Sequence, residues 1–176
     1  RGGDAAADIT GALLDLDASY LAVHGPPGTG KTFTSAKVIA TLVNTHRWRI
    51  GGVVAQSHAV VEKNLFRDVL GAGVDGGARV AKKLNTVSNG WTEIGNPEFA
   101  GFIAGNDGCV VGGTAWDFAS DNKIPAESLD LLVVEEAGQF SLANTIAVSR
   151  AARNLLLLGD PPQQLPPQVS RAPIPS

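Results

Sequence analysis

The sequence predicts an α/β domain with a mainly parallel sheet flanked by helices. An apolar segment at 20–24 leads into a glycine-rich loop, and residues with helical spacing of apolar side chains follow it. Further along, apolar runs alternate with amphipathic segments. The run at 129–134 is almost continuously apolar, which is typical of a strand buried on both faces of a parallel sheet. Alternation of this kind indicates strand–helix–strand units.

Length and composition narrow the class of protein. A chain of 176 residues is typical of one domain with a substantial core. The net charge of −3 argues against a globally basic nucleic-acid-binding surface, so any such contact would be local. The single cysteine, Cys109, cannot form an intrachain disulfide. We find neither a signal peptide nor a long apolar run, and we expect a cytoplasmic location.

The first half of the predicted sheet surrounds the glycine-rich loop. An amphipathic helix over 4–17 precedes the first strand at 20–24, and a second helix over 32–46 follows the loop. The second strand is expected at 51–55. Ser57 can then cap the next helix.

The middle of the chain has a weaker pattern. Glycines at 71–77 end the preceding helix, a short strand is expected at 79–82, and a short helix at 98–104. Trp91 could stack on a base, but packing over a loop is the better interpretation.

The second half has clearer strands. The third core strand is expected at 109–112, and the run at 129–134 is the next. A helix through 142–148 leads to a last strand at 155–158. The proline-rich stretch 161–176 has no obvious way to continue the core.

The glycine-rich loop fits the phosphate-binding pattern G-x-x-x-x-G-K-[ST], with the sequence Gly25-Pro26-Pro27-Gly28-Thr29-Gly30-Lys31-Thr32. Glycines let backbone N–H groups turn inward around a triphosphate without Cβ clashes. Lys31 would bring a positive charge to the β- and γ-phosphates, and the Thr32 hydroxyl would ligate Mg²⁺. The loop also precedes a helix N-terminus, so it predicts nucleoside triphosphate binding.

Two carboxylates follow the run at 129–134, and Val133-Val134-Glu135-Glu136 has the form of a Walker B element. Glu136 is the better candidate for the base that polarises water, and Glu135 would hold Mg²⁺ opposite Thr32. The alternative is a pair of solvated acids at a strand end.

Polar residues follow five of the predicted strands: Lys31, Ser57, Thr114, Glu135 and Asp160. Ligands of parallel sheets bind outside the carboxyl ends of the strands, so we expect these residues to line one edge. In the loop after Gly159, a glutamine could hydrogen-bond the γ-phosphate. The alternative there is a proline-stiffened surface turn.

With these segments placed, the chain resembles a superfamily 1 helicase of the 5′-to-3′ branch. It is similar to the RNA-surveillance and Okazaki-processing nuclease–helicases, and in particular to the helicase part of bacterial proteins with a RecB-like nuclease domain. Residues 25–32 match motif I, and Ala55-Gln56-Ser57-His58-Ala59-Val60 resembles motif Ia. Gly113-Thr114-Ala115 falls where a DNA-contact motif is expected. Glu135-Glu136-Ala137-Gly138-Gln139 resembles motif II, and the Gly159-Asp160 loop resembles motif III.

The resemblance implies a RecA-like P-loop NTPase domain over 1–168, with a proline-rich tail or truncated continuation at 169–176. The family hydrolyses ATP with Mg²⁺ and steps along single-stranded DNA or RNA. By the same resemblance Glu136 is the catalytic base, and Ser57 and Thr114 contact the strand backbone.

The resemblance also implies missing partners. A second RecA-like domain supplies the family's arginine finger, worth roughly 10³–10⁵ in turnover, and a fused nuclease domain is possible. The chain has no methionine and starts at Arg1. We therefore expect a fragment of a longer protein that binds ATP but hydrolyses it slowly by itself.

The chain departs from the family pattern at two places. Glu135 stands where the family has Asp, so its longer side chain shifts the metal-binding carboxylate. The proline-rich loop has one residue more than the loop of the family, so two alignments are open. Counting forward from Asp160 makes Gln163 the residue that senses the γ-phosphate, whereas counting back from Leu165 makes it Gln164. We favour Gln164.

Two other functions compete with a motor. The first is a nucleotide-gated nucleic-acid-binding module in which Glu135 and the altered loop have impaired hydrolysis. The second is a P-loop kinase for a small molecule, against which Glu135, Glu136 and the lack of a lid with clustered arginines argue.

Overall fold

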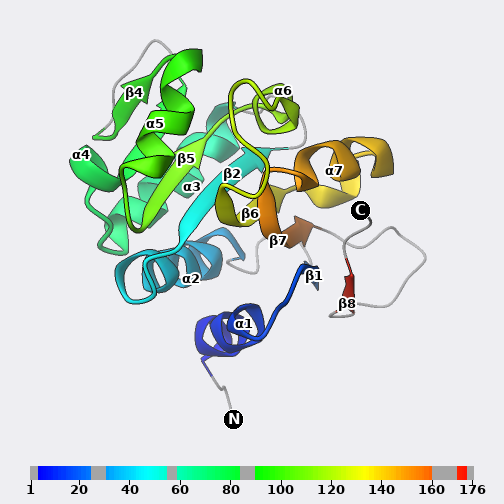
Figure 1. The fold of residues 1–176 in the computed structure, drawn as a ribbon. Helices are drawn as coiled ribbons and strands as arrows, with labels where there is room; N and C mark the ends of the chain where they lie inside the picture. The colour runs from blue at the N-terminus through cyan, green and yellow to red at the C-terminus, as the bar shows by residue number, and fades with distance from the viewer. Residues whose placement is uncertain (1–3, 25–30, 55–58, 84–89, 160–169, 174–176) are drawn as a thin grey trace.

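The computed structural model describes residues 4–24, 31–54, 59–83, 90–159 and 170–173. Figure 1 shows their helices and strands. The strands are β1 Ser19–His24, β2 Arg49–Val54, β3 Val80–Lys83, β4 Thr92–Ile94, β5 Cys109–Gly112, β6 Leu129–Glu135, β7 Ala152–Gly159 and β8 Ser170–Pro173. The helices are α1 Ala5–Leu14, α2 Lys31–Asn44, α3 Ala59–Gly71, α4 Gly76–Arg79, α5 Phe99–Ala104, α6 Ala115–Ala119 and α7 Leu142–Ser149, with 3-10 turns η1 Asn96–Glu98 and η2 Ala137–Gln139.

These strands form one sheet in the order β4-β3-β5-β2-β6-β7-β1-β8. The pairings from β4 through to β1 are all parallel, and β8 pairs antiparallel with β1. The α/β fold with a mainly parallel sheet is therefore confirmed.

Strand β6 is buried on both faces, as its apolar run predicted. Leu131 and Val133 belong to the core on the face covered by α1, α2 and α3. Leu132 and Val134 belong to the core on the opposite face, with side chains of α5, α6 and α7. Successive side chains of a strand point to opposite faces, so one continuous apolar run fills both cores.

Strand β8 lies in the stretch where the sequence showed no strand pattern. Residues 170–173 pair with 19–22 of β1 at the edge of the sheet. Pairing at an open edge needs only backbone N–H and C=O groups, and an edge strand tolerates proline. Composition was therefore a poor guide to this segment.

The indole of Trp91 packs in the core and does not lie open to a base. It is 7% exposed, and its ring centroid lies 5.7 Å from that of Phe66 in α3. The packing interpretation is confirmed, although the neighbouring strand β4 was not predicted.

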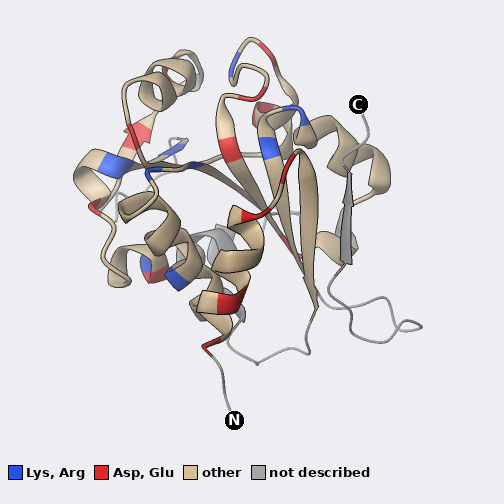
Figure 2. Ribbon diagram, turned by 60° about the horizontal axis from the view of Figure 1, so that its bottom comes forward, with Lys and Arg blue, Asp and Glu red and all other residues tan. Residues whose placement is uncertain are grey.

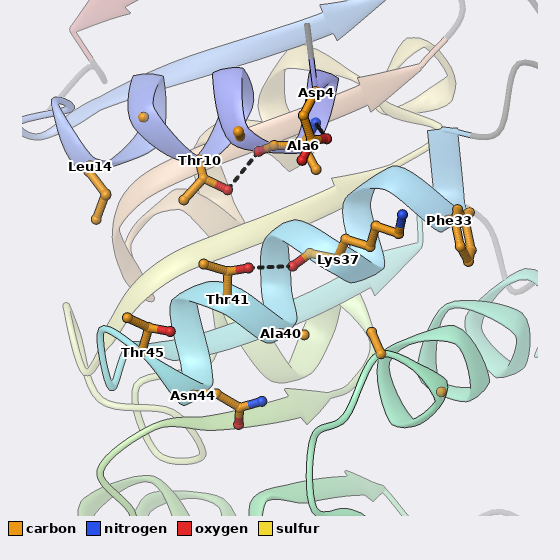
Figure 3. Close-up of a pocket in the computed structure, with 14 residues that line it drawn as sticks. Asp4, Ala6, Thr10, Leu14, Phe33, Lys37, Ala40, Thr41, Asn44 and Thr45 are labelled. Atoms are coloured by element: carbon orange, nitrogen blue, oxygen red, sulfur yellow. Dashed lines mark hydrogen bonds between the residues drawn. The ribbon is translucent and has the colours of Figure 1, made fainter.

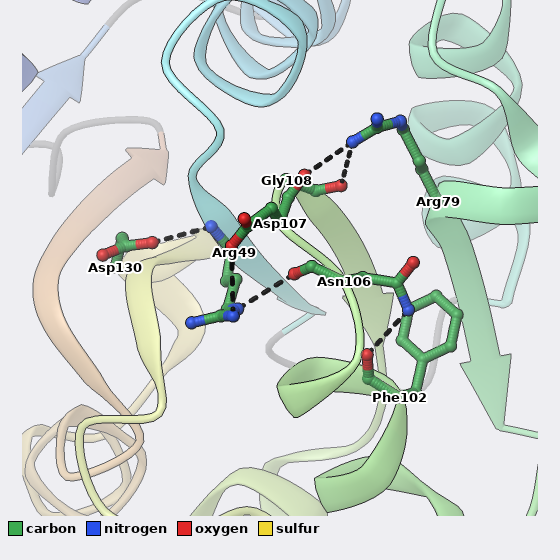
Figure 4. A network of polar contacts seen from close by, with 7 residues as sticks. All are labelled: Arg49, Arg79, Phe102, Asn106, Asp107, Gly108 and Asp130. Atoms are coloured by element: carbon green, nitrogen blue, oxygen red, sulfur yellow. Dashed lines mark hydrogen bonds and ion pairs between the residues drawn. The ribbon is translucent and has the colours of Figure 1, made fainter.

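Two arginines fasten the loop at 105–108 at the amino edge of the sheet (Figure 4). Arg49 donates to the Asn106 carbonyl at 2.9 Å, and Arg79 donates to the carbonyls of Asp107 and Gly108 at 2.6 and 2.9 Å. These bonds fix the start of β5 against β2 and β3.

Charged residues of both signs are interspersed on the described elements (Figure 2). Among the residues that the structure describes, no helix is long and apolar enough to cross a membrane.

Candidate functional site at the carboxyl edge

The carboxyl ends of the central strands lie at one level of the sheet. Val54 of β2 pairs with Glu135 of β6, and His24 of β1 pairs with Gly159 of β7. The end of β5 joins the same edge through the pairing of Gly112 with β2. The described strand ends therefore meet at one edge, as the sequence predicted.

Several predicted site residues lie outside the described residues. They are Gly25, Pro26, Pro27, Gly28, Thr29 and Gly30 of the loop, Ser57, Asp160, Gln163 and Gln164. Their roles stay predictions.

The backbone of Lys31 and Thr32 forms the start of α2. Strand β1 ends at His24, so the predicted phosphate-binding loop connects the carboxyl edge of the sheet to this helix N-terminus. The unsatisfied N–H groups at the start of a helix favour an anion. The strand before the motif and the helix after it, which the motif requires, are both present.

Glu135, the last residue of β6, is 4% exposed. Its Oε2 has no hydrogen-bond partner among the described residues. Burial, the neighbouring Glu136 and Asp68 of α3 raise the pKa of the Glu135 carboxyl to about 7, with burial the largest cause. A buried carboxylate oxygen without a donor favours a proton or a cation beside it. The interpretation of Glu135 as a solvated acid is therefore wrong.

Glu136 has a left-handed backbone, with φ 53° and ψ 42°. This conformation is uncommon for a residue other than glycine, and such outliers gather at functional sites. The chain leaves β6 here and turns into η2. Its half-buried side chain also departs from a fully solvated acid. No local sequence signal predicts this turn, because Gly and Asn are the usual left-handed residues.

Thr114 is the N-cap of α6, and its hydroxyl is engaged within the protein. Its Oγ1 donates to Asp117 Oδ2 at 2.9 Å, and its backbone N–H donates to the same oxygen at 2.8 Å. Lys123 Nζ donates to the other oxygen, Asp117 Oδ1, at 3.0 Å. Because a hydroxyl has one proton, Thr114 in this arrangement does not donate to a phosphate.

Asp117 is fully buried and was missed from the sequence. The signal was available, since Thr114-Ala115-Trp116-Asp117 has the spacing of a capping box. From the sequence we considered Thr114 only as a residue that contacts the nucleic acid.

A groove of about 720 Å³ lies between α1 and α2 and reaches the first turn of α2 (Figure 3). The ring of Phe33 lines it and is 58% exposed, and Lys37 Nζ lies 4.6 Å from the ring centroid. Phe33 fits the helical spacing of the core positions in α2, so only the structure shows that it faces outward.

A family model described as an AAA domain matches residues 6–171, which is most of the chain. The chain belongs to the AAA domain family. No curated protein matches this AAA domain.

Among solved structures, the AAA domain is similar to a nuclease-deletion mutant of the Type ISP restriction-modification enzyme LlaGI, solved in complex with a DNA substrate mimic. The TM-score is 0.60 at 15% sequence identity. The match covers 97% of this chain and 18% of the enzyme chain. At this identity the likeness shows the fold alone, a RecA-like α/β sheet. The domain spans less than a fifth of that chain.

Proposed function

We propose that this AAA domain is the ATP-binding and ATP-hydrolysing motor domain of a superfamily 1 helicase of the 5′-to-3′ branch. It would couple ATP hydrolysis to movement on single-stranded DNA, or on RNA, in the cytoplasm. The observation that carries the proposal is the buried carboxylate of Glu135, which shares one sheet edge with the end of β1, the strand that precedes the predicted phosphate-binding loop.

The residues present fit Mg²⁺-ATP. Glu135 Oε2 has no hydrogen-bond partner among the described residues, and a divalent cation would supply the missing positive charge. The described residues hold no group of three or more His, Cys, Asp or Glu side chains that could bind a metal. The ion would therefore be held jointly by the Glu135 carboxylate, the Thr32 hydroxyl and phosphate oxygens of the nucleotide, as is usual for Mg²⁺.

Each site residue then has a role. Lys31 and the backbone of the loop at 25–30 bind the phosphates, and bound Mg²⁺ would neutralise phosphate charge. Glu136 orients the attacking water and accepts its proton, and Gln164 hydrogen-bonds the γ-phosphate.

Contacts with the strand and with other domains complete the proposal. Ser57 contacts the sugar–phosphate backbone of the nucleic acid, and Thr114 does the same once its hydroxyl is released from Asp117. A second RecA-like domain of the same protein supplies the arginine finger, and a fused nuclease domain is a further partner. The DNA substrate mimic in the LlaGI structure is consistent with a DNA track.

Steady-state ATP hydrolysis of the parent protein, with and without single-stranded DNA, tests this function. We expect DNA to stimulate turnover and Glu136→Gln to abolish it while leaving ATP binding intact. Glu127→Gln is a matched control, because Glu127 also has a positive φ but precedes β6 at the opposite edge. Equal turnover of the wild type and Glu136→Gln would contradict the proposed base.

A nucleotide-gated module is the second candidate, and it rests on Glu135, whose side chain is one methylene longer than the Asp of the family and shifts the metal-binding carboxylate. It predicts tight Mg²⁺-ATP binding that Lys31→Ala abolishes, with no turnover. Restoration of turnover by Glu135→Asp would identify the longer side chain as the cause.

A further inference from the structure

We propose that Trp116 is the platform on which a nucleobase of the bound single strand stacks. This inference rests on the proposed function, because it assigns a further contact to the same nucleic-acid-binding edge. The contact proposed for Trp116 is with the bases, whereas the contacts proposed for Ser57 and Thr114 are with the sugar–phosphate backbone of the nucleic acid.

The exposure of Trp116 sets it apart from the other tryptophans of the chain. Its residue is 83% exposed, whereas Trp91 is 7% exposed and Trp48 is half-buried. A tryptophan side chain normally buries most of its large apolar surface. It stands in the first turn of α6, which starts after Gly112 at the carboxyl edge where Glu135 also lies.

The start of α6 is firmly held, so that the exposed indole is presented on a fixed support. Asp117 receives three hydrogen bonds, from the N–H and hydroxyl of Thr114 and from Lys123 Nζ, and the bonds from the N–H and from Lys123 remain when the hydroxyl turns to the nucleic acid. Gly113 lets this corner close, because a Cβ there would lie 3.1 Å from Asp117 Oδ2. These contacts fix the backbone position of Trp116, so less backbone freedom is lost when a ligand binds.

Charge favours contact with a base over contact with a phosphate at this place. Lys123 is paired with Asp117, and Arg150 is paired with Asp121 while donating to two backbone carbonyls. An aromatic face binds any base without needing a cation, as in proteins that bind single strands without sequence preference.

An apolar protein partner is the competing occupant of this surface. Leu142 and Ile146 of α7 are 75% and 43% exposed, and α7 packs against α6. These two side chains lack an aromatic face, so they distinguish base stacking from general apolar docking.

The test is nucleic-acid binding by the parent protein, followed by tryptophan fluorescence and by the anisotropy of labelled oligo(dT) and oligo(rU). We expect both strands to quench the wild-type emission, and an abasic strand of equal charge to leave it unchanged. Trp116→Ala should bind roughly 5- to 150-fold more weakly, in line with about 1–3 kcal/mol per stacked base. Trp116→Phe should keep most of the affinity, and Leu142→Ala should change it less than twofold.

The salt dependence gives a readout that a damaged fold would not reproduce. Loss of a stacking contact should lower the affinity of Trp116→Ala at every salt concentration without changing the slope of log K against log salt, because no phosphate contact is lost.

Three results would overturn the inference. If Trp116→Ala bound DNA like the wild type while DNA still stimulated hydrolysis, the motor proposal would stand without this contact. If Leu142→Ala weakened binding as much as Trp116→Ala, or if the emission changed with protein concentration alone, the surface would be an apolar docking site. If the wild type bound neither strand, the inference and the proposed function would fall together.

Discussion

Gly159 at the end of β7 lies backbone against backbone with Gly138 in the turn after Glu136. A Cβ built on Gly159 would lie 3.0 Å from the Gly138 nitrogen and 3.1 Å from the Ala137 nitrogen. Both contacts are with main-chain atoms, which cannot rotate away as a side chain can. The missing side chain of Gly159 therefore lets β7 support the turn that contains the predicted base.

We expect Gly159→Ala to displace this turn by a few tenths of an ångström and to reduce ATP turnover by about tenfold, because catalysis depends steeply on the placement of its groups. Nucleotide affinity should change little, since the predicted phosphate loop belongs to β1 and α2. Gly52→Ala in β2 is the control: its Cβ would meet only Leu65 Cδ2 at 3.8 Å, an ordinary contact. Similar turnover for both variants would show that the turn adapts without loss.

Gly51 and its neighbour Gly52 provide a second comparison, this time of stability. A Cβ at Gly51 would lie 2.7 Å from Phe118 Cε1, 2.8 Å from Leu129 Cδ1 and 2.9 Å from Leu132 Cδ1. We expect Gly51→Ala to lower the free energy of unfolding by about 1–3 kcal/mol through overpacking, and Gly52→Ala to have a smaller effect. Urea unfolding measures both variants, and an equal effect would contradict the packing described for β2.

The pKa of the Glu135 carboxyl predicts a pH dependence of the metal-free and nucleotide-free protein. Folding raises this pKa from 4.5 to about 7, mainly through burial, so the folded state prefers the protonated form. The resulting stabilisation is complete below pH 4.5 and is lost as the pH rises through 7, by about 3 kcal/mol.

Glu135→Gln lacks this titration. As the pH rises from 4.5 to 8, the free energy of unfolding of Glu135→Gln should therefore increase relative to that of the wild type. Urea unfolding at several pH values measures the difference, and a difference that does not vary with pH would rule out the shifted carboxyl.

Two ion pairs in the segment around α6 should differ in their contribution to stability. Asp117 is fully buried and accepts from Thr114 and Lys123, so Asp117→Ala should cost about 2–4 kcal/mol. Asp121→Ala should cost much less, because the Asp121 side chain is exposed. Its partner Arg150 also keeps its hydrogen bonds to the backbone carbonyls of Phe118 and Ile124. Thermal unfolding of the two variants tests the order, which the reverse ranking would refute.

The sequence alone predicted the fold class and the strands that carry the candidate site. The apolar run at 129–134 can be satisfied only by burial on both faces, so it identified β6 and the place of Glu135. A loop rich in glycine likewise predicted a helix from Thr32, one residue after the observed start of α2 at Lys31. These signals are local, because they depend on side-chain periodicity and on the conformations that a few adjacent residues allow.

The short strands β3 and β4, the edge strand β8 and the helix α6 carry weaker local signals. Three to five residues define no period, and the conformation of such a segment follows from the strand or loop against which it packs. Sequence reasoning accordingly placed β3 only approximately and did not find β4, β8 or α6.

What the sequence determined by itself is which chemical groups follow which strands, because composition and periodicity are properties of neighbouring residues. What only the tertiary structure decided is the environment of those groups: the burial of Glu135, the left-handed turn at Glu136, the engagement of Thr114 by Asp117 and the exposure of Trp116. Each of these depends on segments that are distant in the chain or on the exact turn of the backbone. Long-range packing selects among conformations that local preferences leave open.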